Sequence, residues 1–307
     1  MSSSRQRIAI TGASGLIGGA LSRVLAARGD DVIRLVRHQP TNPQQRQWDP
    51  QQRSLPVEAV VDVDAIVHLA GAGVGDRRWT PAYKDLVLRS RLDGTTAVAE
   101  AIAGVGRPIR LVSASAVGYY GSRGDEILTE TSAGGDGFLA DVVRVWEGAT
   151  EAAVAAGAPV ALARTGLVMS PTGGAFERLL RLARLGLGGP LGSGRQWWPW
   201  ITLADEVAAL VHLIDHRDVV GPVNLVSPDP RPQREIATAI GKNLGRPAIL
   251  PAPAFALRVA VGEFADDILA SQRVLPNRLT EQGFRFRHAT LSDGVGYLLD
   301  ASGPVTP

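Results

Sequence analysis

The first 168 residues alternate short apolar runs with longer segments in which apolar residues recur every three or four positions. Short runs bounded by turn residues are typical of buried strands, and they cover residues 7–10, 32–36, 65–69, 108–113 and 159–168. The helical spacing occupies residues 16–27, 82–105 and 138–156. Strands that alternate with helices predict an α/β fold of Rossmann type, with a doubly wound parallel sheet.

The pattern changes after Met169. Residues 171–200 are rich in glycine, arginine and tryptophan, which indicates long loops around one helix. A further helical segment leads to residues 223–226, a predicted strand that rejoins the sheet, and the tail is mainly helical with proline-marked turns. We therefore predict a Rossmann domain over residues 1–168 and a smaller, mainly helical C-terminal substrate lobe over residues 169–307.

Composition narrows the classes of protein. The chain has no cysteine, which excludes disulfides, thiolate nucleophiles and cysteine metal sites, and which fits a cytoplasmic protein. No apolar run approaches the roughly 20 residues that cross a bilayer, and no secretory signal follows the polar start. The net charge is +2, the arginines are scattered, and the five histidines have no ligand spacing. We expect a small-molecule substrate and no membrane, nucleic-acid or metal partner, and the oligomeric state stays open.

The segment from Thr11 to Gly18, Thr-Gly-Ala-Ser-Gly-Leu-Ile-Gly, lies between a predicted strand and a predicted helix. Gly12 allows a tight turn, Gly15 leaves room for a pyrophosphate, and Gly18 lets the helix pack closely on the sheet. Free N–H groups at the start of the helix then face the phosphates. The strand–turn–helix context favours a dinucleotide site over the alternative, a plain turn before a surface helix.

The end of the second predicted strand indicates which dinucleotide is bound. In Rossmann folds an acidic residue there accepts the 2′-hydroxyl of NAD, and a basic residue accommodates the 2′-phosphate of NADP. In this chain the strand ends in Arg37 and His38, whereas Asp30 and Asp31 precede it. Because an arginine pairs with a phosphate through its planar fork, we predict NADP over NAD, with Arg37 as the main discriminator. The alternative is that Arg37 is a solvated loop arginine.

The spacing of the three glycines resembles the loop of the short-chain dehydrogenase/reductase superfamily, in its extended, epimerase-like branch. Four later segments are similar to motifs of that superfamily, and they are residues 68–71, 113–121, 164–168 and 200–205. Shorter blocks match one subfamily, the "epimerase family" proteins of bacteria and mitochondria, at Arg78-Trp79, Ser90-Arg91, 186–194, 245–247 and 283–286. The resemblance implies the Rossmann fold and a bound cofactor.

The phosphate loop, the strand end and the resemblance together give a set of expected cofactor contacts. They are Gly12, Ser14, Gly15, Leu16, Ile17, Gly18, Arg37, His38, Leu69, Ala70, Gly71, Arg91, Ser113, Arg164 and Leu167. Leu69 and Ala70 have a second interpretation as ordinary core residues, and both interpretations can hold together.

The usual catalytic pair of the superfamily is missing. That pair is a tyrosine with a lysine four residues later on one helix, assisted by a serine, and it moves a proton. None of the four tyrosines stands four residues before a lysine, and the helix that should carry the pair starts Phe138-Leu-Ala-Asp-Val-Val. By resemblance Ser115 is the candidate serine, and Tyr119 or Tyr120 could supply a phenol nearby. Ser115 could equally be a strand-end serine bonded to the backbone, and the tyrosines packing residues.

The loop Arg195-Gln-Trp-Trp-Pro-Trp200 has two interpretations. Arg195 and Trp198, together with Trp79, could wall a substrate pocket, or the tryptophans could hold the two lobes together.

Two functions follow from these patterns. The first is an NADP-binding oxidoreductase or epimerase that acts on a small carbonyl or hydroxyl substrate. The second is a non-catalytic NADP(H)-binding redox sensor or regulatory protein, which the missing tyrosine–lysine pair motivates. Turnover of the cofactor would separate them.

Overall fold

The computed structural model describes residues 5–300, and its centre is one parallel sheet of seven strands. In chain order the strands are β1 (Arg7–Thr11), β2 (Asp31–Val36), β3 (Gln45–Gln47), β4 (Ala65–His68), β5 (Arg110–Ala116), β7 (Val160–Thr165) and β11 (Gly221–Leu225). Their order across the sheet is β11-β7-β5-β4-β1-β2-β3. The predicted doubly wound Rossmann-type sheet is therefore confirmed. Its winding reverses between β1 and β4, where such sheets bind their ligands.

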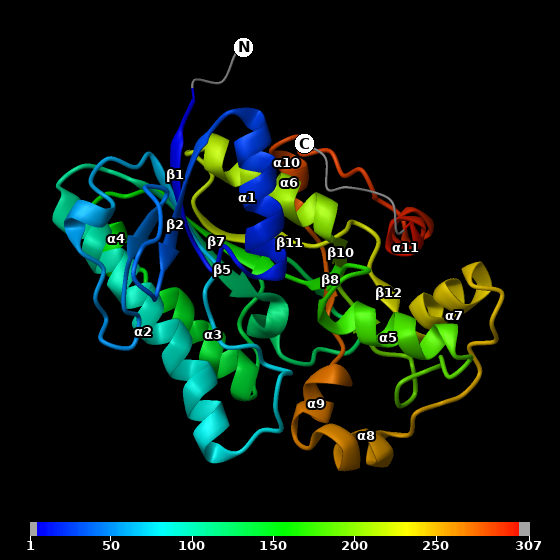
Figure 1. The fold of residues 1–307 in the computed structure, drawn as a ribbon. Coiled ribbons are helices and arrows are strands. Elements are labelled where there is room, and N and C mark those ends of the chain that lie inside the picture. The colour runs from blue at the N-terminus through cyan, green and yellow to red at the C-terminus, as the bar shows by residue number, and fades with distance from the viewer. Residues whose placement is uncertain (1–4, 301–307) are drawn as a thin grey trace.

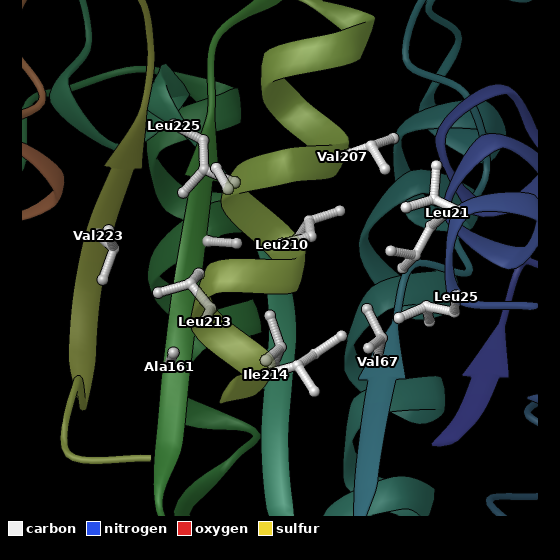
Figure 2. Packing of buried hydrophobic residues seen from close by; sticks show 14 of the residues in the cluster. Leu21, Leu25, Val67, Ala161, Val207, Leu210, Leu213, Ile214, Val223 and Leu225 are labelled. Carbon is white, nitrogen blue, oxygen red and sulfur yellow. The ribbon is translucent and has the colours of Figure 1, made fainter. Parts of the chain in front are cut away.

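Helices cover both faces of this sheet (Figure 1). One layer holds α1 (Leu16–Arg28) and α6 (Leu203–Asp215), which contact each other, and the other holds α2 (Pro81–Val105), α3 (Phe138–Gly148) and α4 (Glu151–Ala155). Figure 2 shows the core under the first layer, where Leu21 of α1 and Leu210 of α6 share a cluster with Val67 of β4. Because both faces are covered, β4 is buried along its whole length.

The helix predicted over residues 138–156 is two helices in the structure. Helix α3 ends at Gly148 and α4 begins at Glu151. At the turn between them, the hydroxyl of Thr150 donates to the carbonyl of Glu147, at 2.8 Å. A threonine that bonds its own backbone in this way competes with helical hydrogen bonding, so the prediction of one continuous helix was wrong.

The strand predicted over residues 159–168 is also interrupted. It leaves the main sheet after Thr165, and the next residues form β8 (Leu167–Met169), which pairs with β10 (Trp200–Thr202). Gly166 is the break, because a Cβ at this position would lie 2.4 Å from the carbonyl oxygen of Pro199. Only a glycine allows the two backbones to approach so closely.

The C-terminal part of the chain has a core of its own, which includes Phe176, Trp198 and Trp200. Its helices are α5 (Gly174–Arg184), α7 (Gln233–Asn243), α8 (Ala254–Val261), α9 (Phe264–Ile268), α10 (Asn277–Glu281) and α11 (Leu291–Leu299). Two short strand pairs complete it, β6 (Ile127–Leu128) with β13 (Arg273–Val274) and β9 (Trp197–Trp198) with β12 (Arg231–Pro232).

The strand predicted near residues 223–226 is β11, and it rejoins the sheet beside β7, as expected. Helix α6 also belongs to the sheet layers, although both elements follow residue 168 in the chain. The domain boundary at that residue therefore stays a prediction. Across residues 5–300, no helix combines the length and the apolar character that crossing a bilayer requires.

Candidate functional site

The loop between β1 and α1 is built on glycines that the local geometry requires. Gly12 has a φ of 67°, and a Cβ there would lie 3.0 Å from backbone atoms of Leu69 and Ala70. A Cβ on Gly18 would lie 2.3 Å from the carbonyl oxygen of Gly12. A side chain on Gly12 would push the loop off the end of β4. A side chain on Gly18 would push α1 away from the loop. The roles predicted for these two glycines in the turn and the close packing fit this geometry.

The first turn of α1 is open to a ligand. Its N-cap residue, Gly15, provides no side-chain cap, and Ser14 and Gly15 are exposed. Leu16 and Ile17 are half-buried and begin the helix. N–H groups at a helix start have no acceptor inside the helix and carry its positive dipole end, so this turn can hold an anion such as a phosphate.

Thr11 fixes the end of β4 beside this loop. Its Oγ1 accepts the N–H groups of Leu69 and Ala70, at 3.0 and 3.1 Å. Since both lone pairs are then used, its proton goes to Nδ1 of His68, at 2.8 Å, and His68 carries its own ring proton on Nε2. Burial lowers the pKa of His68 to about 4, with a smaller contribution from the charge of Arg91. A neutral histidine therefore anchors the segment predicted to line the cofactor.

Arg91 of α2 places a half-buried cation at the same edge of the sheet. Its Nη1 donates to the carbonyl oxygens of Ala72 and Val87, at 2.9 and 3.0 Å, and its guanidinium lies 4.9 Å from the ring of Trp146. It lies alongside Gly71, whose Cβ, if present, would be 3.7 Å from the guanidinium. Burial lowers the pKa of Arg91 to about 10, and no carboxylate within residues 5–300 pairs with it.

The structure places Arg37 and His38 in the exposed segment just after β2. His38 bonds the carbonyl of Gln39, whereas Arg37 has no ion-pair partner in the described part of the chain. Asp31 is the first residue of β2 and pairs with Arg7 at the opposite end of the strand. Basic and acidic residues therefore lie at opposite ends of β2, as predicted, although Asp31 is the first residue of the strand and does not precede it.

Ser115, Glu147 and Arg164 form a buried network under α3. Ser115 donates its hydroxyl proton to Glu147 Oε1, at 2.6 Å. Arg164 pairs with both carboxylate oxygens of Glu147, at 2.8 Å each. Burial alone would lower the pKa of Arg164, but the hydrogen bonds and charge of Glu147 raise it above its ordinary value. The partner of Ser115 is thus a carboxylate, not the backbone.

Glu147 is the residue of this network that sequence reasoning missed. It lies inside a helical segment with no motif around it, so only its hydrogen bonds to Ser115 of β5 and Arg164 of β7 reveal its role. Ser113, two residues before Ser115 on the same strand, is buried, and its hydroxyl bonds the carbonyl of Ala114, at 3.4 Å. Leu167 is half-buried at the start of β8.

The two tyrosines of the short helix η2 (Val117–Tyr120) differ in their surroundings. Tyr120 is fully buried, accepts from Arg164 at 3.1 Å and donates to Asn224 at 2.7 Å. Burial raises its pKa. Tyr119 is half-buried, and its ring centroid lies 3.5 Å from the Arg164 guanidinium. Its hydroxyl has no hydrogen-bond partner within residues 5–300.

Apolar residues occupy the start of α3, where the tyrosine–lysine pair was expected. Phe138 and Val142 have the four-residue spacing of that pair, and both pack with Tyr83 and Val87 of α2. Trp79 meets Phe138 edge-on, with ring centroids 4.9 Å apart. No residue at the start of α3 therefore replaces the tyrosine and lysine of the standard proton relay.

The three residues expected to line a substrate pocket do not lie together in the structure. Trp198 is buried in the core of the C-terminal part, and its indole donates to the carbonyl of Ile268. Trp197 reaches Asp125 in the loop after β5, with 2.7 Å between donor and acceptor. Trp198 is buried and Trp197 bonds to a distant loop. Both observations favour the interpretation in which the tryptophans hold the two lobes together.

Arg195 lines a pocket of about 410 Å³. Its other lining residues are Gly124, Asp125, Gly192, Ser193, Gln196, Ala254, Leu269 and Ser271. Trp79 does not line this pocket, and its ring contacts Phe138 edge-on and Phe264 of α9 at a tilted angle. Nowhere in residues 5–300 do three or more metal-ligating side chains gather.

Comparisons with known proteins agree with this architecture. The model of the NAD dependent epimerase/dehydratase family matches residues 8–226, and a second model, Domain of unknown function (DUF1731), matches residues 252–295. "Epimerase family protein Mb2239" of Mycobacterium bovis is 43% identical over 96% of this chain and 98% of its own.

Solved structures give the same result. The human epimerase family protein SDR39U1 (isoform 2) with NADPH is 32% identical, with a TM-score of 0.87 over 96% of this chain and 99% of its own. MoeE5 in complex with UDP-glucose and NAD is 22% identical, with a TM-score of 0.73 over 95% and 97%, and shows the fold alone. The resemblance found in the sequence is confirmed: the chain belongs to the NAD dependent epimerase/dehydratase family, within the short-chain dehydrogenase/reductase superfamily.

Proposed function

We propose that the protein binds NADP(H) at the carboxyl edge of its sheet and acts as an oxidoreductase on a small carbonyl or hydroxyl substrate. The observation that carries the proposal is Arg37. It is exposed where β2 ends and has no ion-pair partner within residues 5–300, whereas Asp31 lies at the other end of the strand. A free guanidinium at this position suits the 2′-phosphate of NADP and provides no acceptor for the 2′-hydroxyl proton of NAD.

The phosphate loop and Arg91 support the same cofactor. The uncapped first turn of α1 supplies N–H donors, and Gly15 keeps that turn free of a side chain. Arg91 adds a half-buried cation without a carboxylate partner beside Gly71. Removing much of a charge from water is costly unless an anion balances it, and a bound phosphate group would do so.

The relatives' cofactors support dinucleotide binding and make the choice between NADP and NAD worth measuring. The human relative's structure contains NADPH, whereas the more distant MoeE5 structure contains NAD. The preference of this chain therefore rests on its own Arg37.

Carbonyl reduction needs a hydride, which the reduced nicotinamide supplies, and a proton for the oxygen. Ser115 and Tyr120 already donate their hydroxyl protons inside the buried network, and Phe138 and Val142 have no acidic proton. Tyr119 is the remaining phenol nearby, and its hydroxyl is unoccupied within the described chain. We assign proton donation to Tyr119.

Titration with NADPH and NADH, followed by nicotinamide fluorescence, tests the cofactor. We expect Arg37→Ala to weaken NADPH binding by about tenfold to a hundredfold, because charged hydrogen bonds to the phosphate are lost, and to leave NADH unchanged. Arg34→Ala is the matched control, since Arg34 is an exposed arginine on the same strand. Equal affinity for both cofactors, or equal effects of both substitutions, would contradict the role of Arg37.

NADPH oxidation with a panel of aldehydes and ketones tests the reaction. We expect turnover that Tyr119→Phe lowers by about a hundredfold or more, with NADPH affinity unchanged, as for loss of a general acid. Tyr297→Phe on α11 serves as the control. Unchanged turnover in Tyr119→Phe would assign the proton to another group.

The internal bonding of Ser115 and Tyr120 also favours a second candidate, a non-catalytic NADP(H) sensor. A sensor would bind NADPH with the Arg37 dependence described above and would oxidise it with no member of the panel. The titration and the turnover assay together therefore distinguish the two functions.

A further inference from the structure

Exposed large apolar side chains concentrate on one region of the C-terminal part. Thirteen such residues are at least two-fifths exposed within residues 5–300, and seven of them lie in two short segments. These seven are named the apolar patch: Leu182, Leu185, Leu187, Ile249, Leu250, Phe255 and Val259. The other six are distributed over the rest of the molecule, so the patch is a local feature and not a general property of the surface.

The two segments lie side by side. The backbone N–H of Leu250 donates to the carbonyl of Gly188, and that of Ala252 donates to the carbonyl of Pro190. Helix α8 begins two residues later, near α5 and its following loop in Figure 1. Phe255 and Val259 are one helical turn apart and thus share a face of α8, each 71% exposed.

Helix α8 has no buried residue of its own. An isolated helix of eight residues is marginal in water, so its apolar face gains from being covered. Seven side chains of this size present several hundred Å² of apolar surface, which exceeds the scattered exposure usual for a monomer.

Within the two segments that carry the patch, every charged residue is basic. Residues 178–204 and 236–262 contain no aspartate or glutamate. Arg184, Lys242 and Arg246 lie in these segments, are exposed and have no ion-pair partner within residues 5–300. Arg181 and Arg258 pair with Glu177 and Asp266 just outside the segments, so three cations beside the apolar side chains are without a carboxylate partner within residues 5–300.

We propose that the apolar patch docks on an anionic membrane surface. Phe255, Val259 and the leucines would enter the boundary between headgroups and acyl chains, and Arg184, Lys242 and Arg246 would meet the phosphates. A second copy of this chain fits less well, because a two-fold interface places a patch against itself and would bring like charges together.

This mode of binding needs no spanning segment. The expectation of no membrane partner rested on the lack of a long apolar run, and no helix within residues 5–300 could cross a bilayer. A surface patch binds a membrane peripherally, which requires neither a long apolar run nor a spanning helix.

Vesicle flotation with the whole chain tests the proposal. The probes are phosphatidylcholine vesicles and phosphatidylcholine vesicles that also contain phosphatidylserine. We expect flotation with the anionic vesicles, weakened by salt, and little with the neutral ones. Phe255→Ser with Val259→Ser should weaken binding by about tenfold or more, since two large apolar groups no longer leave water.

The matched control is Val145→Ser with Val154→Ser, which removes two exposed apolar side chains on α3 and α4. Its binding should equal that of the natural chain, and circular dichroism melting should be similar for all variants. Three results would overturn the proposal: no flotation, equal flotation with neutral vesicles, or equal losses in both double variants. A dimer in analytical ultracentrifugation that Phe255→Ser with Val259→Ser abolishes would assign the patch to a second copy instead.

Discussion

At the scale of single residues, Glu206 is a buried carboxyl group whose protonation is coupled to folding. It lies in the first turns of α6, is buried, and accepts a hydrogen bond from Thr165 at 2.8 Å. Its Oε2 has no partner within residues 5–300. Burial raises the pKa of Glu206 to about 8, although the bond from Thr165 acts in the opposite direction. Near neutral pH the folded protein therefore holds this carboxyl mainly protonated.

The raised pKa makes stability depend on pH with a definite sign. The unfolded chain releases this proton near its ordinary pKa of 4.5. The contribution to stability is thus complete below that pH and is lost as the pH rises through about 8, at about 1.4 kcal/mol per pH unit. We predict that Glu206→Gln removes this slope and is more stable than the natural chain at alkaline pH, by a few kcal/mol.

Urea unfolding at about pH 5 and about pH 8.5 measures the difference. The control is Glu151→Gln, which removes an exposed glutamate from α4 and should leave the slope unchanged. A slope that persists in Glu206→Gln would show that another group causes it.

The candidate site divides into residues that the sequence could predict and residues that it could not. Gly12, Gly18 and Arg37 are predictable, because a glycine spacing or a strand end ties each to one geometric task. Glu147 and the neutral His68 are not, since their roles come from partners far along the chain, Arg164 and Thr11. Long-range pairing of this kind leaves no local pattern.

At the scale of elements, short-range signals placed α1 and its end correctly. Gly29, which closely follows the helical segment predicted over residues 16–27, caps α1 with a φ of 95° and bonds back to the carbonyls of Leu25 and Ala26. The breaks near Thr150 and at Gly166 were missed, because apolar periodicity continues through both. At Gly166 the cause is another backbone, that of Pro199, which approaches from far along the chain.

Arg110, at the amino end of the parallel strands, is a further residue whose role the sequence could not predict. It is fully buried in β5 and donates to the carbonyls of Leu213, Arg217 and Val219. These carbonyls belong to the end of α6 and the turn that leads to β11, so the guanidinium caps the connection between helix and strand. Burial lowers the pKa of Arg110 to about 10. A charged residue inside an apolar run carries no sequence signal of this role.

At the scale of the whole molecule, Asp205 connects the C-terminal segment to the sheet layers. It is buried at the start of α6, and its carboxylate accepts the backbone N–H groups of Arg287 and His288, at 2.8 and 2.9 Å. The residues just before them, Phe284 and Phe286, pack on the main core. One carboxylate thus holds a segment that lies some eighty residues later in the chain against α6.

We predict that Asp205→Asn loosens this attachment. An amide of the same shape has one acceptor oxygen, and its NH₂ group would face an N–H donor, so one buried donor loses its partner. The expected loss of stability is about 3 kcal/mol, with faster hydrogen exchange confined mainly to residues 284–299.

Asp215→Asn at the other end of α6 is the control, because Asp215 is partly exposed and pairs with Arg28 near the surface, where such pairs contribute little. Hydrogen exchange that rises uniformly over the sheet in Asp205→Asn would mean that Asp205 supports the main core rather than the attachment of the C-terminal segment. Exchange confined to residues 284–299 would show that the buried carboxylate of Asp205 fixes this segment against α6, beside the packing of Phe284 and Phe286 on the main core.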